Sequence, residues 1–354
     1  MLDSSSPSTT SFEVEDADNE FDGIINFRDV GKTVNDFLGK KVLKEGILFR
    51  SAKLDDASYR DRLRLTEVYG IKSVIDLRSK TEHLNAQEKH KFLQKSLPLK
   101  IPGISYTRII LPSRRFELFL LWQLSWFNIF KFLLLYPLSR PHAISLISHH
   151  ALAPLGLPSL SLNTLFYSSP SISLCLSSLF PPSPSPSSIS PPPPPTIIHC
   201  TQGKDRTGLL LILILLTLSI PVPAITHDYH LTNSSCPLIR QIRLSEVREV
   251  GLPDSFADTH QEMVTSVISW LEETHGGVDG YLDQIGFDEA KRQRLRAVLL
   301  WEGEQQPPQH QHQQRDVKKS ETSIDISPPS SPSDSESSSV VVVAIDMSKS
   351  ETSI

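Results

Sequence analysis

The alternation of apolar and polar positions along the chain predicts a series of short strands and helices. The segment SYRDRLRLTEVYG at 58–70 has helical spacing and ends on a glycine, while IKSVIDL at 71–77 is an apolar run typical of a buried strand. Further along, TII at 196–198 predicts another short strand, and the apolar run at 207–223 predicts a buried helix that a proline ends. The amphipathic pattern at 288–301 predicts one more helix.

Both ends of the chain are polar and are predicted to be disordered arms outside a domain at 21–301. Residues 1–20 are rich in serine and acidic side chains, and they lack the basic and apolar regions of a secretory signal. Residues 302–354 are rich in Gln, His, Pro and Ser and hold nine acidic against four basic side chains. Such compositions bury too little apolar surface to offset the entropy cost of ordering the chain.

The stretch at 137–195 is poor in charge. Between Lys131 and Lys204 lie 72 residues, of which Arg140 is the only Lys, Arg, Asp or Glu, whereas the chain average of 21% would give about 15. Within this stretch, 181–195 contains nine prolines and five serines and is predicted to be extended or polyproline II. We therefore interpret part of it as an insertion or a faulty translation, degraded or low in complexity, and not as an evolved core.

The segment before it, FELFLLWQLSWFNIFKFLLLY at 116–136, is strongly apolar. It is long enough to span a bilayer, which takes about 20 residues, but Glu117, Gln123, Asn128 and Lys131 interrupt it. This spacing favours a buried or interfacial helix over a membrane-spanning one, and it leaves peripheral contact with a membrane open.

Charge and cysteine content narrow the classes of function. The formal net charge of −5 argues against nucleic acid as a partner, because binding to a phosphate backbone needs concentrated Lys and Arg. Three cysteines, Cys175, Cys200 and Cys236, are too few for a disulfide framework, so we expect a reducing, cytoplasmic compartment. The histidine pairs at 149–150 and at 310 and 312 lack Cys or acidic neighbours at metal-ligand spacing, so we expect no metal and no other cofactor.

The segment TIIHCTQGKDRTGLLL at 196–211 carries the chemistry. It places Cys200 at the end of a strand and Arg206 six positions later, where a helix begins. The five residues between them can form a loop with inward-pointing backbone N–H groups, to which the helix adds the positive end of its dipole. We interpret this loop as an anion site for a tetrahedral phosphate, formed by Thr201, Gln202, Gly203 and Lys204 together with Arg206 and Thr207.

Each polar residue of the loop has a predicted role. Cys200 lies at the floor, where the same field stabilises its thiolate as a nucleophile for phosphoryl transfer. The planar guanidinium of Arg206 binds two phosphate oxygens, and Gly203 lets the backbone approach the ligand. Asp205 is the candidate general acid by elimination, since no other aspartate lies at a plausible place. The remaining contributions are charge at the rim from Lys204, stabilisation of the sulfur by the Thr207 hydroxyl, and ordering of the loop by His199.

The sequence HCTQGKDRTG at 199–208 resembles the signature loop of the cysteine-dependent tyrosine-protein phosphatases. Its Lys-Asp-Arg version resembles an atypical tyrosine/serine phosphatase family that has many fungal members. The resemblance covers about 21–301. Further segments that resemble parts of this family are FDGIINFRDVG (21–31), GILFRSAKLDD (46–56), GIKSVIDLRSKTE (70–82), IPVPAITHDYHLT (220–232) and GGVDGYLDQIGFD (276–288).

The resemblance implies an α/β phosphatase fold, with a central sheet flanked by helices, and metal-free hydrolysis of phosphate monoesters through a cysteinyl-phosphate intermediate. A phosphorylated protein, with phosphotyrosine, is the default substrate, and phosphoinositides or inositol phosphates are the close alternative. A second alternative is an inactive phosphate-binding scaffold, disabled by the charge-poor stretch. Two groups keep open interpretations: Asn26, Arg28 and Asp29 either support the site or fix a turn, and Arg50 and Arg78 either line the pocket or form buried ion pairs.

Overall fold

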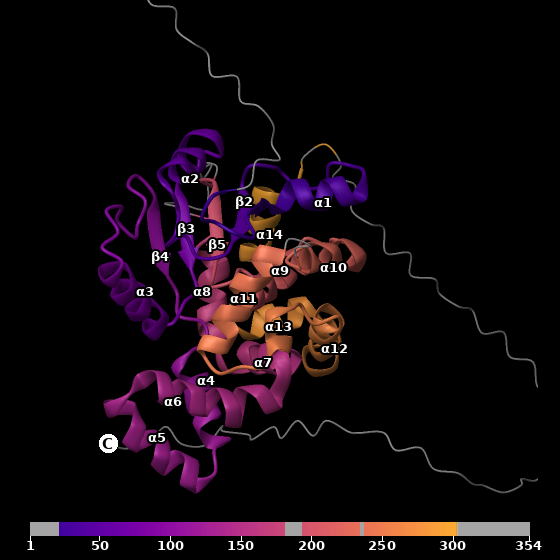
Figure 1. Ribbon diagram of the computed structural model, residues 1–354. Coiled ribbons are helices and arrows are strands. Elements are labelled where there is room, and N and C mark those ends of the chain that lie inside the picture. The colour runs from indigo at the N-terminus through magenta and orange to yellow at the C-terminus, as the bar shows by residue number, and fades with distance from the viewer. Residues whose placement is uncertain (1–20, 181–192, 234–236, 302, 304–354) are drawn as a thin grey trace, which may run out of the picture. The chain divides into compact units, whose positions relative to one another are not determined.

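A five-stranded sheet lies at the centre of the computed structural model, which describes residues 21–180, 193–233, 237–301 and 303 (Figure 1). The strand order is β1-β2-β5-β3-β4; β1 pairs with β2 antiparallel, and all other pairs are parallel. Strand β5 therefore lies between β2 and β3. The strands are β1 (Arg28–Asp29), β2 (Leu48–Ser51), β3 (Ser73–Asp76), β4 (Ser105–Arg108) and β5 (Thr196–His199).

Helices flank this sheet, which confirms the predicted α/β fold. The predicted helix at 58–70 is divided into α2 and a π-helical turn at Arg64–Val68, and Ser58 and Asp61 form a capping box at its start. The helices are α1 (Val30–Leu38), α2 (Tyr59–Leu63), α3 (Lys80–Phe92), α4 (Arg114–Trp122), α5 (Trp126–Leu138), α6 (Arg140–Ile147), α7 (Ala153–Tyr167), α8 (Ser169–Ser177), α9 (Asp205–Thr217), α10 (Val222–His230), α11 (Pro237–Glu249), α12 (Met263–His275), α13 (Val278–Gln284) and α14 (Glu289–Leu299).

Both faces of the sheet are apolar. Successive side chains of a strand point to opposite sides, so neighbouring apolar residues contribute to different faces. Ile198 of β5 belongs to a large buried cluster that includes most of α9, whereas its neighbour Ile197 belongs to a second cluster that includes Leu65 and Ile71. Helix α9 is buried on nearly all sides, as expected for a helix that is apolar all round. The core therefore fixes the height and direction of α9 against the end of β5.

The predicted helix at 207–223 is divided in the structure. Helix α9 ends at Thr217 and α10 begins at Val222, with Pro221 as the residue before its first turn. Proline has a fixed φ and no N–H, so it ends one helix and starts the next. The division places residues of α10 next to β1 and β2, where they enter the site described below.

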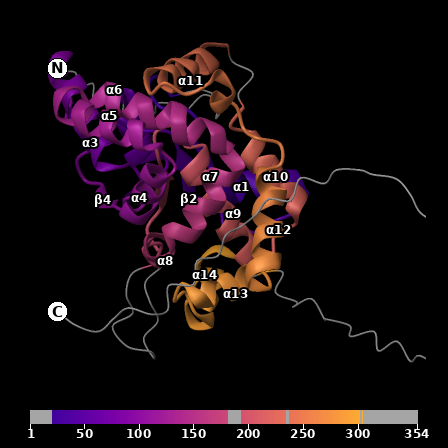
Figure 2. The same cartoon turned by 90° about the horizontal axis from the view of Figure 1, so that it is seen from below.

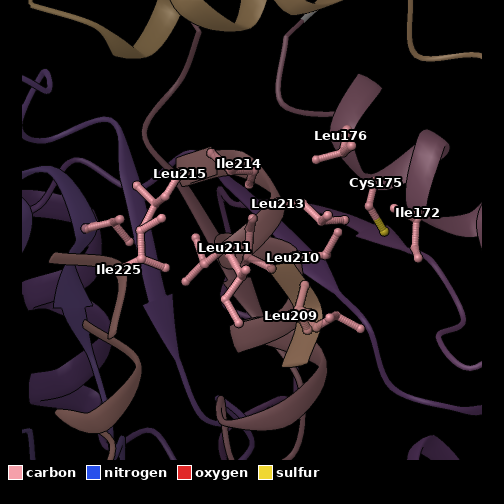
Figure 3. Close-up of a cluster of buried hydrophobic side chains, with 14 of the residues drawn as sticks. Ile172, Cys175, Leu176, Leu209, Leu210, Leu211, Leu213, Ile214, Leu215 and Ile225 are labelled. Carbon is pink, nitrogen blue, oxygen red and sulfur yellow. The ribbon is translucent and has the colours of Figure 1, made fainter. Parts of the chain in front are cut away.

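The charge-poor stretch forms helices in the part that the structure describes. Helices α6, α7 and α8 span 140–177, and Ile172, Cys175 and Leu176 of α8 pack against α9 (Figure 3). Residues 181–192 lie outside the described part, as do the predicted arm at 1–20 and the predicted arm at 302–354 apart from residue 303. The interpretation of part of 137–195 as an insertion or faulty translation stays a prediction.

The apolar segment at 116–136 forms two helices, α4 and α5, with a break at 123–125. Many of its apolar side chains are exposed, including Trp126 at 88% and Phe127 at 73%. Among the described residues, no helix has both the length and the apolar character needed to cross a bilayer. Seen from below, α5 and α6 lie away from α13 and α14 (Figure 2).

Candidate active site

The loop from Cys200 to Lys204 joins the end of β5 to the first residue of α9. Its carbonyl groups are held from one side by hydrogen-bond donors. The backbone N–H of Lys53 donates to the Thr201 carbonyl at 3.0 Å, and Nδ2 of Asn26 donates to the carbonyls of Gln202 and Gly203 at 3.0 Å each. Because a trans peptide group points its N–H opposite to its carbonyl, the N–H groups of residues 202–204 face away from these donors, as an anion-binding loop requires.

Gly203 is the position where the loop tolerates no side chain. Its φ is +65°, in the left-handed region, and a Cβ built there would lie 2.1 Å from the carbonyl oxygen of Ser51. Glycine is the residue that accepts both the backbone conformation and the close approach. The loop is therefore pressed directly against the end of β2.

A cavity of about 290 Å³ opens over the loop. Of the predicted site residues it brings together Cys200, Thr201, Gln202, Asp205 and Arg206 along its wall. The Cys200 side chain is 3% exposed, so its sulfur lies at the bottom of the cavity. The other lining residues come mainly from α3 and from the segment that includes α11 and Phe256.

Arg206 is anchored by a carboxylate that the sequence analysis did not single out. Its NH1 lies 2.8 Å from Oε2 of Glu82, and its NH2 lies 2.6 Å from Oε1. Although burial alone would favour the neutral forms, this ion pair raises the pKa of Arg206 and lowers the pKa of Glu82. Glu82 also accepts a hydrogen bond from the hydroxyl of Thr201, so one carboxylate orients two residues of the loop.

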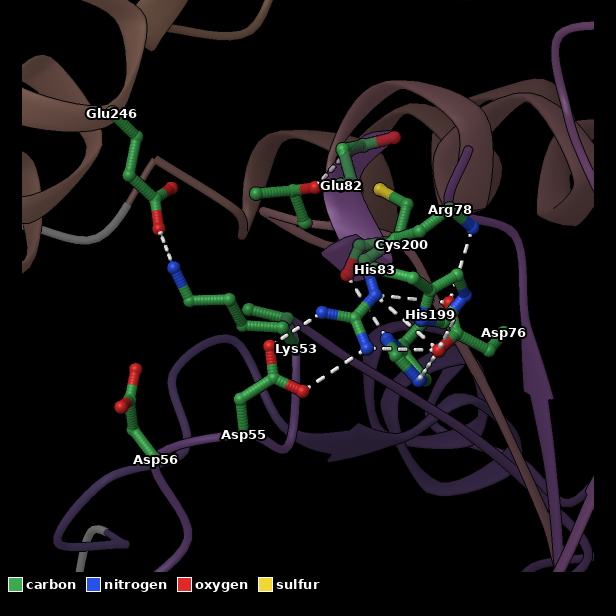
Figure 4. Close-up of polar contacts among 12 residues, drawn as sticks. Lys53, Asp55, Asp56, Asp76, Arg78, Glu82, His83, His199, Cys200 and Glu246 are labelled. Atoms are coloured by element: carbon green, nitrogen blue, oxygen red, sulfur yellow. Dashed lines mark hydrogen bonds and ion pairs between the residues drawn. The ribbon is translucent and has the colours of Figure 1, made fainter. Parts of the chain in front are cut away.

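A second buried network lies beside the loop, at the ends of β3 and β5 (Figure 4). Arg78 bonds to Asp76 at 2.9 and 3.0 Å and also to Asp55, so it forms buried ion pairs. Burial opposes the charge of Asp76, but the adjacent His199 and the bonds from Arg78 lower its pKa to about 2. Nδ1 of His199 lies 3.0 Å from the Cys200 carbonyl, and burial lowers the pKa of this imidazole.

Three predicted residues, Lys204, Thr207 and Asp29, have surroundings that limit the roles open to them. The side chain of Lys204 is fully buried instead of lying at the rim, and its Nζ bonds to Oδ1 of Asp205 at 2.7 Å and to the Asp258 carbonyl at 3.1 Å. The hydroxyl of Thr207 is buried and has no hydrogen-bond partner among the described residues. Asp29 caps α1 by accepting from the backbone of Lys32, so it fixes a turn and does not reach the loop.

Asn26 and Arg28 reach the loop from β1 and the residues before it. Asn26 contacts two loop carbonyls directly, and Arg28 donates to the Asn26 side-chain oxygen. Arg28 and Arg50 both bind Asp228 of α10. The arrangement therefore joins segments that are 200 positions apart in the sequence.

Sequence reasoning missed Glu82 and Asp228 as contributors to the site. The signal for Glu82 was the pattern Ser79-Lys80-Thr81-Glu82 after a predicted strand, which is a capping box that starts α3 at the edge of the loop. Asp228 lies in the segment at 220–232, which resembles the family, but its local pattern assigns no role to this carboxylate. Its role depends on a contact that only the fold creates.

The described residues contain no cluster of side chains suited to binding a metal ion. In 21–180, 193–233, 237–301 and 303, no three His, Cys, Asp or Glu side chains come together in a way that could hold an ion. Cys175 and Cys200 are free and buried, and Cys236 lies outside these ranges.

The fold and the loop define a protein whose cysteine lies at the floor of a cavity, with an arginine at the start of the following helix. The chain belongs to the tyrosine phosphatase family, whose model matches residues 19–119 and 187–301. The match omits 120–186, which contains the end of α4 and all of α5 to α8. It includes every residue of the loop and the contacts from β1, β2 and α3.

A relative of the chain is named as a protein phosphatase. The chain is 30% identical over 120 residues to the triple specificity protein phosphatase PtpB of Mycobacterium tuberculosis, a match that covers 29% of this chain and 43% of that protein. The chain thus spans less than half the length of this relative. A solved structure, the core catalytic domain of the PP-IP phosphatase SIW14 from S. cerevisiae in complex with citrate, matches 71% of this chain and 98% of its own at 15% identity, with a TM-score of 0.24. A superposition this loose bears on neither fold nor function.

Proposed function

We propose that the protein is a phosphomonoesterase that acts through a cysteinyl-phosphate intermediate on Cys200. The observation that carries this proposal is the position of the Cys200 side chain at the bottom of a cavity whose wall also holds Arg206 and Asp205. Membership in the tyrosine phosphatase family supports it. The intact loop, with its carbonyls held to one side, supports an active enzyme over an inactive scaffold.

The mechanism follows from the arrangement of charge in the cavity. The thiolate of Cys200 attacks phosphorus in line, an S–P bond forms, and the P–O bond to the leaving group breaks. Asp205 donates its proton to the departing oxygen. The loop amides and the start of α9 stabilise the equatorial oxygens together with Arg206. Asp205 then accepts a proton from water, which attacks phosphorus and releases inorganic phosphate and the thiolate.

The walls of the cavity favour an aryl phosphate, so we propose phosphotyrosine in proteins as the substrate. Val247, Leu252 and Phe256 form an apolar side that suits an aromatic ring. Carboxylates and cationic groups line the same cavity together, since Asp56 pairs with Lys95 and Glu246 pairs with Lys53, so it presents no excess of positive charge to ligands that carry several phosphates. Phosphoinositides are therefore the second candidate.

A surface on α4 and α5 supports peripheral contact with a membrane, and with it the second candidate. Trp122, Trp126 and Phe130 are 84%, 88% and 69% exposed, and tryptophans favour the boundary between lipid and water. Arg114, Arg115 and Lys131 of these two helices carry positive charge against the single carboxylate of Glu117, a balance that favours anionic lipid. Vesicle flotation tests this contact. It is supported if the protein floats with anionic but not with neutral vesicles and if the double variant Trp126→Ser, Phe130→Ser no longer floats. It is contradicted if the double variant floats as well as the wild type.

We also propose the domain boundaries and a cellular location for the protein. The family matches at 19–119 and 187–301 begin and end close to the bounds of the proposed single domain at 21–301, which leaves arms at 1–20 and 302–354. A nucleophilic thiolate works in a reducing compartment, which supports a cytoplasmic location.

A substrate panel tests the proposed function. The purified chain is assayed with phosphotyrosine peptides, phosphoserine peptides and phosphoinositide vesicles, beside Cys200→Ser as the control. We expect turnover that is fastest with phosphotyrosine and absent in the control. Phosphate binding without turnover supports the scaffold, and activity that survives Cys200→Ser overturns the proposed mechanism.

A further inference from the structure

A buried ion network centred on Asp228 lies beneath the phosphate loop. The Asp228 side chain is 1% exposed and is contacted by two guanidinium groups: Nε of Arg28 lies 2.9 Å from Oδ1, and NH1 of Arg50 bonds to Oδ2. Arg28 also donates to the Asp228 carbonyl at 2.6 Å. Each oxygen of the carboxylate thus binds a different arginine, and the two arginines come from β1 and β2.

The other nitrogens of the two arginines connect Asp228 to the loop. Arg50 bonds to the loop directly, and Arg28 acts on it through Asn26. NH2 of Arg50 donates to the Gly203 carbonyl at 2.7 Å. NH1 of Arg28 donates to Oδ1 of Asn26, and Nδ2 of Asn26 donates to the carbonyls of Gln202 and Gly203. The hydrogen bond from Arg28 fixes which way the Asn26 amide faces, because it selects the oxygen and leaves the amino group for the loop. Every one of these contacts traces back to Asp228.

The charge of Asp228 is needed because two buried cations lie side by side. Arg50 is fully buried and Arg28 is largely so. Among the described residues Asp228 is the one carboxylate that binds both, so its removal would leave two guanidinium groups without an ion-pair partner. Such groups move apart or turn toward water. Either movement releases the Gly203 carbonyl, and with it the direction of the N–H groups on the opposite side of the loop.

We propose that Asp228 is a positioning residue for phosphate binding and transfer: through Arg28, Asn26 and Arg50 it fixes the orientation of the loop amides around the phosphate. The inference rests on the proposed function, since it assigns the loop the task of binding phosphate. Asp228 itself lines no part of the cavity. Its effect on the reaction is indirect and passes through the backbone of the loop.

Asp228→Asn tests this, because the amide keeps the size of the side chain but can accept only one guanidinium. We expect kcat with an aryl phosphate to fall about 100-fold, the loss that misplaced catalytic groups commonly cause. We also expect weaker binding of inorganic phosphate by calorimetry. The matched control is Asp61→Asn, another fully buried carboxylate, which binds the backbone N–H groups of Asp22, Gly23 and Ser58 and does not line the cavity. It should lose stability and keep kcat per folded molecule.

Asn26→Gly keeps the test open if Asp228→Asn does not fold. Asn26 has a φ of +60°, which glycine adopts readily, so the substitution removes the amide without straining the backbone. We expect kcat to fall about tenfold or more, because the substitution removes both hydrogen bonds that Asn26 donates to the loop. The inference is overturned if a folded Asp228→Asn variant keeps the kcat and the phosphate affinity of the wild type. If Asp228→Asn does not fold, the same result in Asn26→Gly overturns it. If the wild-type chain binds phosphate but shows no turnover, the phosphate affinities of the variants still test the inference. If the wild type neither binds phosphate nor turns over substrate, the proposed function fails, and the inference fails with it.

Discussion

Arg206 and Glu82 form a two-bond ion pair at the wall of the cavity, with N–O distances of 2.8 and 2.6 Å. The pair connects the first turn of α9 to the first turn of α3. Because the guanidinium is planar, fixing two of its nitrogens fixes the plane in which the rest of the group can meet a phosphate. Glu82 therefore determines the direction from which Arg206 reaches the cavity.

Glu82→Gln should weaken catalysis while the loop remains in place. An amide can replace only one of the two bonds, so Arg206 gains freedom, and we expect kcat/KM to fall about 10- to 100-fold for an aryl phosphate. Steady-state kinetics measures the change, and Glu88→Gln on the exposed side of the same helix is the control. Equal kinetics for the two variants would show that Arg206 does not depend on its ion pair.

Gly203→Ala and Gly70→Ala form a matched pair for the close contact beneath the loop. Both glycines have a positive φ, +65° and +61°, but only at Gly203 would a Cβ collide, 2.1 Å from the Ser51 carbonyl oxygen. We expect Gly70→Ala to cost about 1–2 kcal/mol of unfolding free energy and no activity. Gly203→Ala should cost more stability and abolish turnover. If the two variants keep the same activity, the loop does not depend on this contact.

Asp205→Asn should reveal the general acid through the leaving group. Loss of the proton donor slows the release of a poor leaving group about 100-fold or more, whereas a good leaving group needs little help. We therefore expect a large fall in kcat with an alkyl phosphate and a small one with p-nitrophenyl phosphate. Equal losses with both substrates assign the proton transfer to another group, and Asp254→Asn on the surface is the control.

Asp76→Asn should change the acid stability of the fold. The pKa of Asp76 is lowered from 3.8 to about 2, so its contribution is complete above pH 4 and is lost as the pH falls toward 2. We expect the variant to lose about 2 kcal/mol of unfolding free energy at pH 7 and to approach the wild type near pH 2. Urea unfolding across this range measures it, with the exposed Asp36→Asn as the control. A difference that does not depend on pH would contradict the assignment.

Local pattern was enough to predict the elements around Cys200. The strand at 196–198, the loop and the start of the next helix depend on residues within 20 positions of one another, and α9 is apolar enough to be recognised as buried. The break between α9 and α10 was not predicted. The apolar run continues past Thr217, and only the turn before Pro221 shows that the helix stops.

The partners of the loop could not be predicted because they come from distant segments. Glu82 and Asp228 meet the loop only after the sheet has formed, and a carboxylate in a helical pattern is usually a solvated side chain. The Lys204 side chain was expected at the rim for the same reason. In the structure the carbonyl of Asp258 and the carboxylate of Asp205 bind its ammonium group below the surface.

The central claim is that phosphate is transferred to the sulfur of Cys200, and trapping that intermediate tests it most directly. An aryl phosphate is mixed with the protein, and the reaction is quenched within milliseconds. The mass of the peptide that contains Cys200 is then measured by mass spectrometry. The account predicts one added phosphoryl group on Cys200 in the wild type and in greater yield in a variant slow to hydrolyse the intermediate, such as Asp205→Asn, and none in Cys200→Ser. Steady turnover with phosphate on another residue, or with no trapped phosphate in either protein, would contradict it.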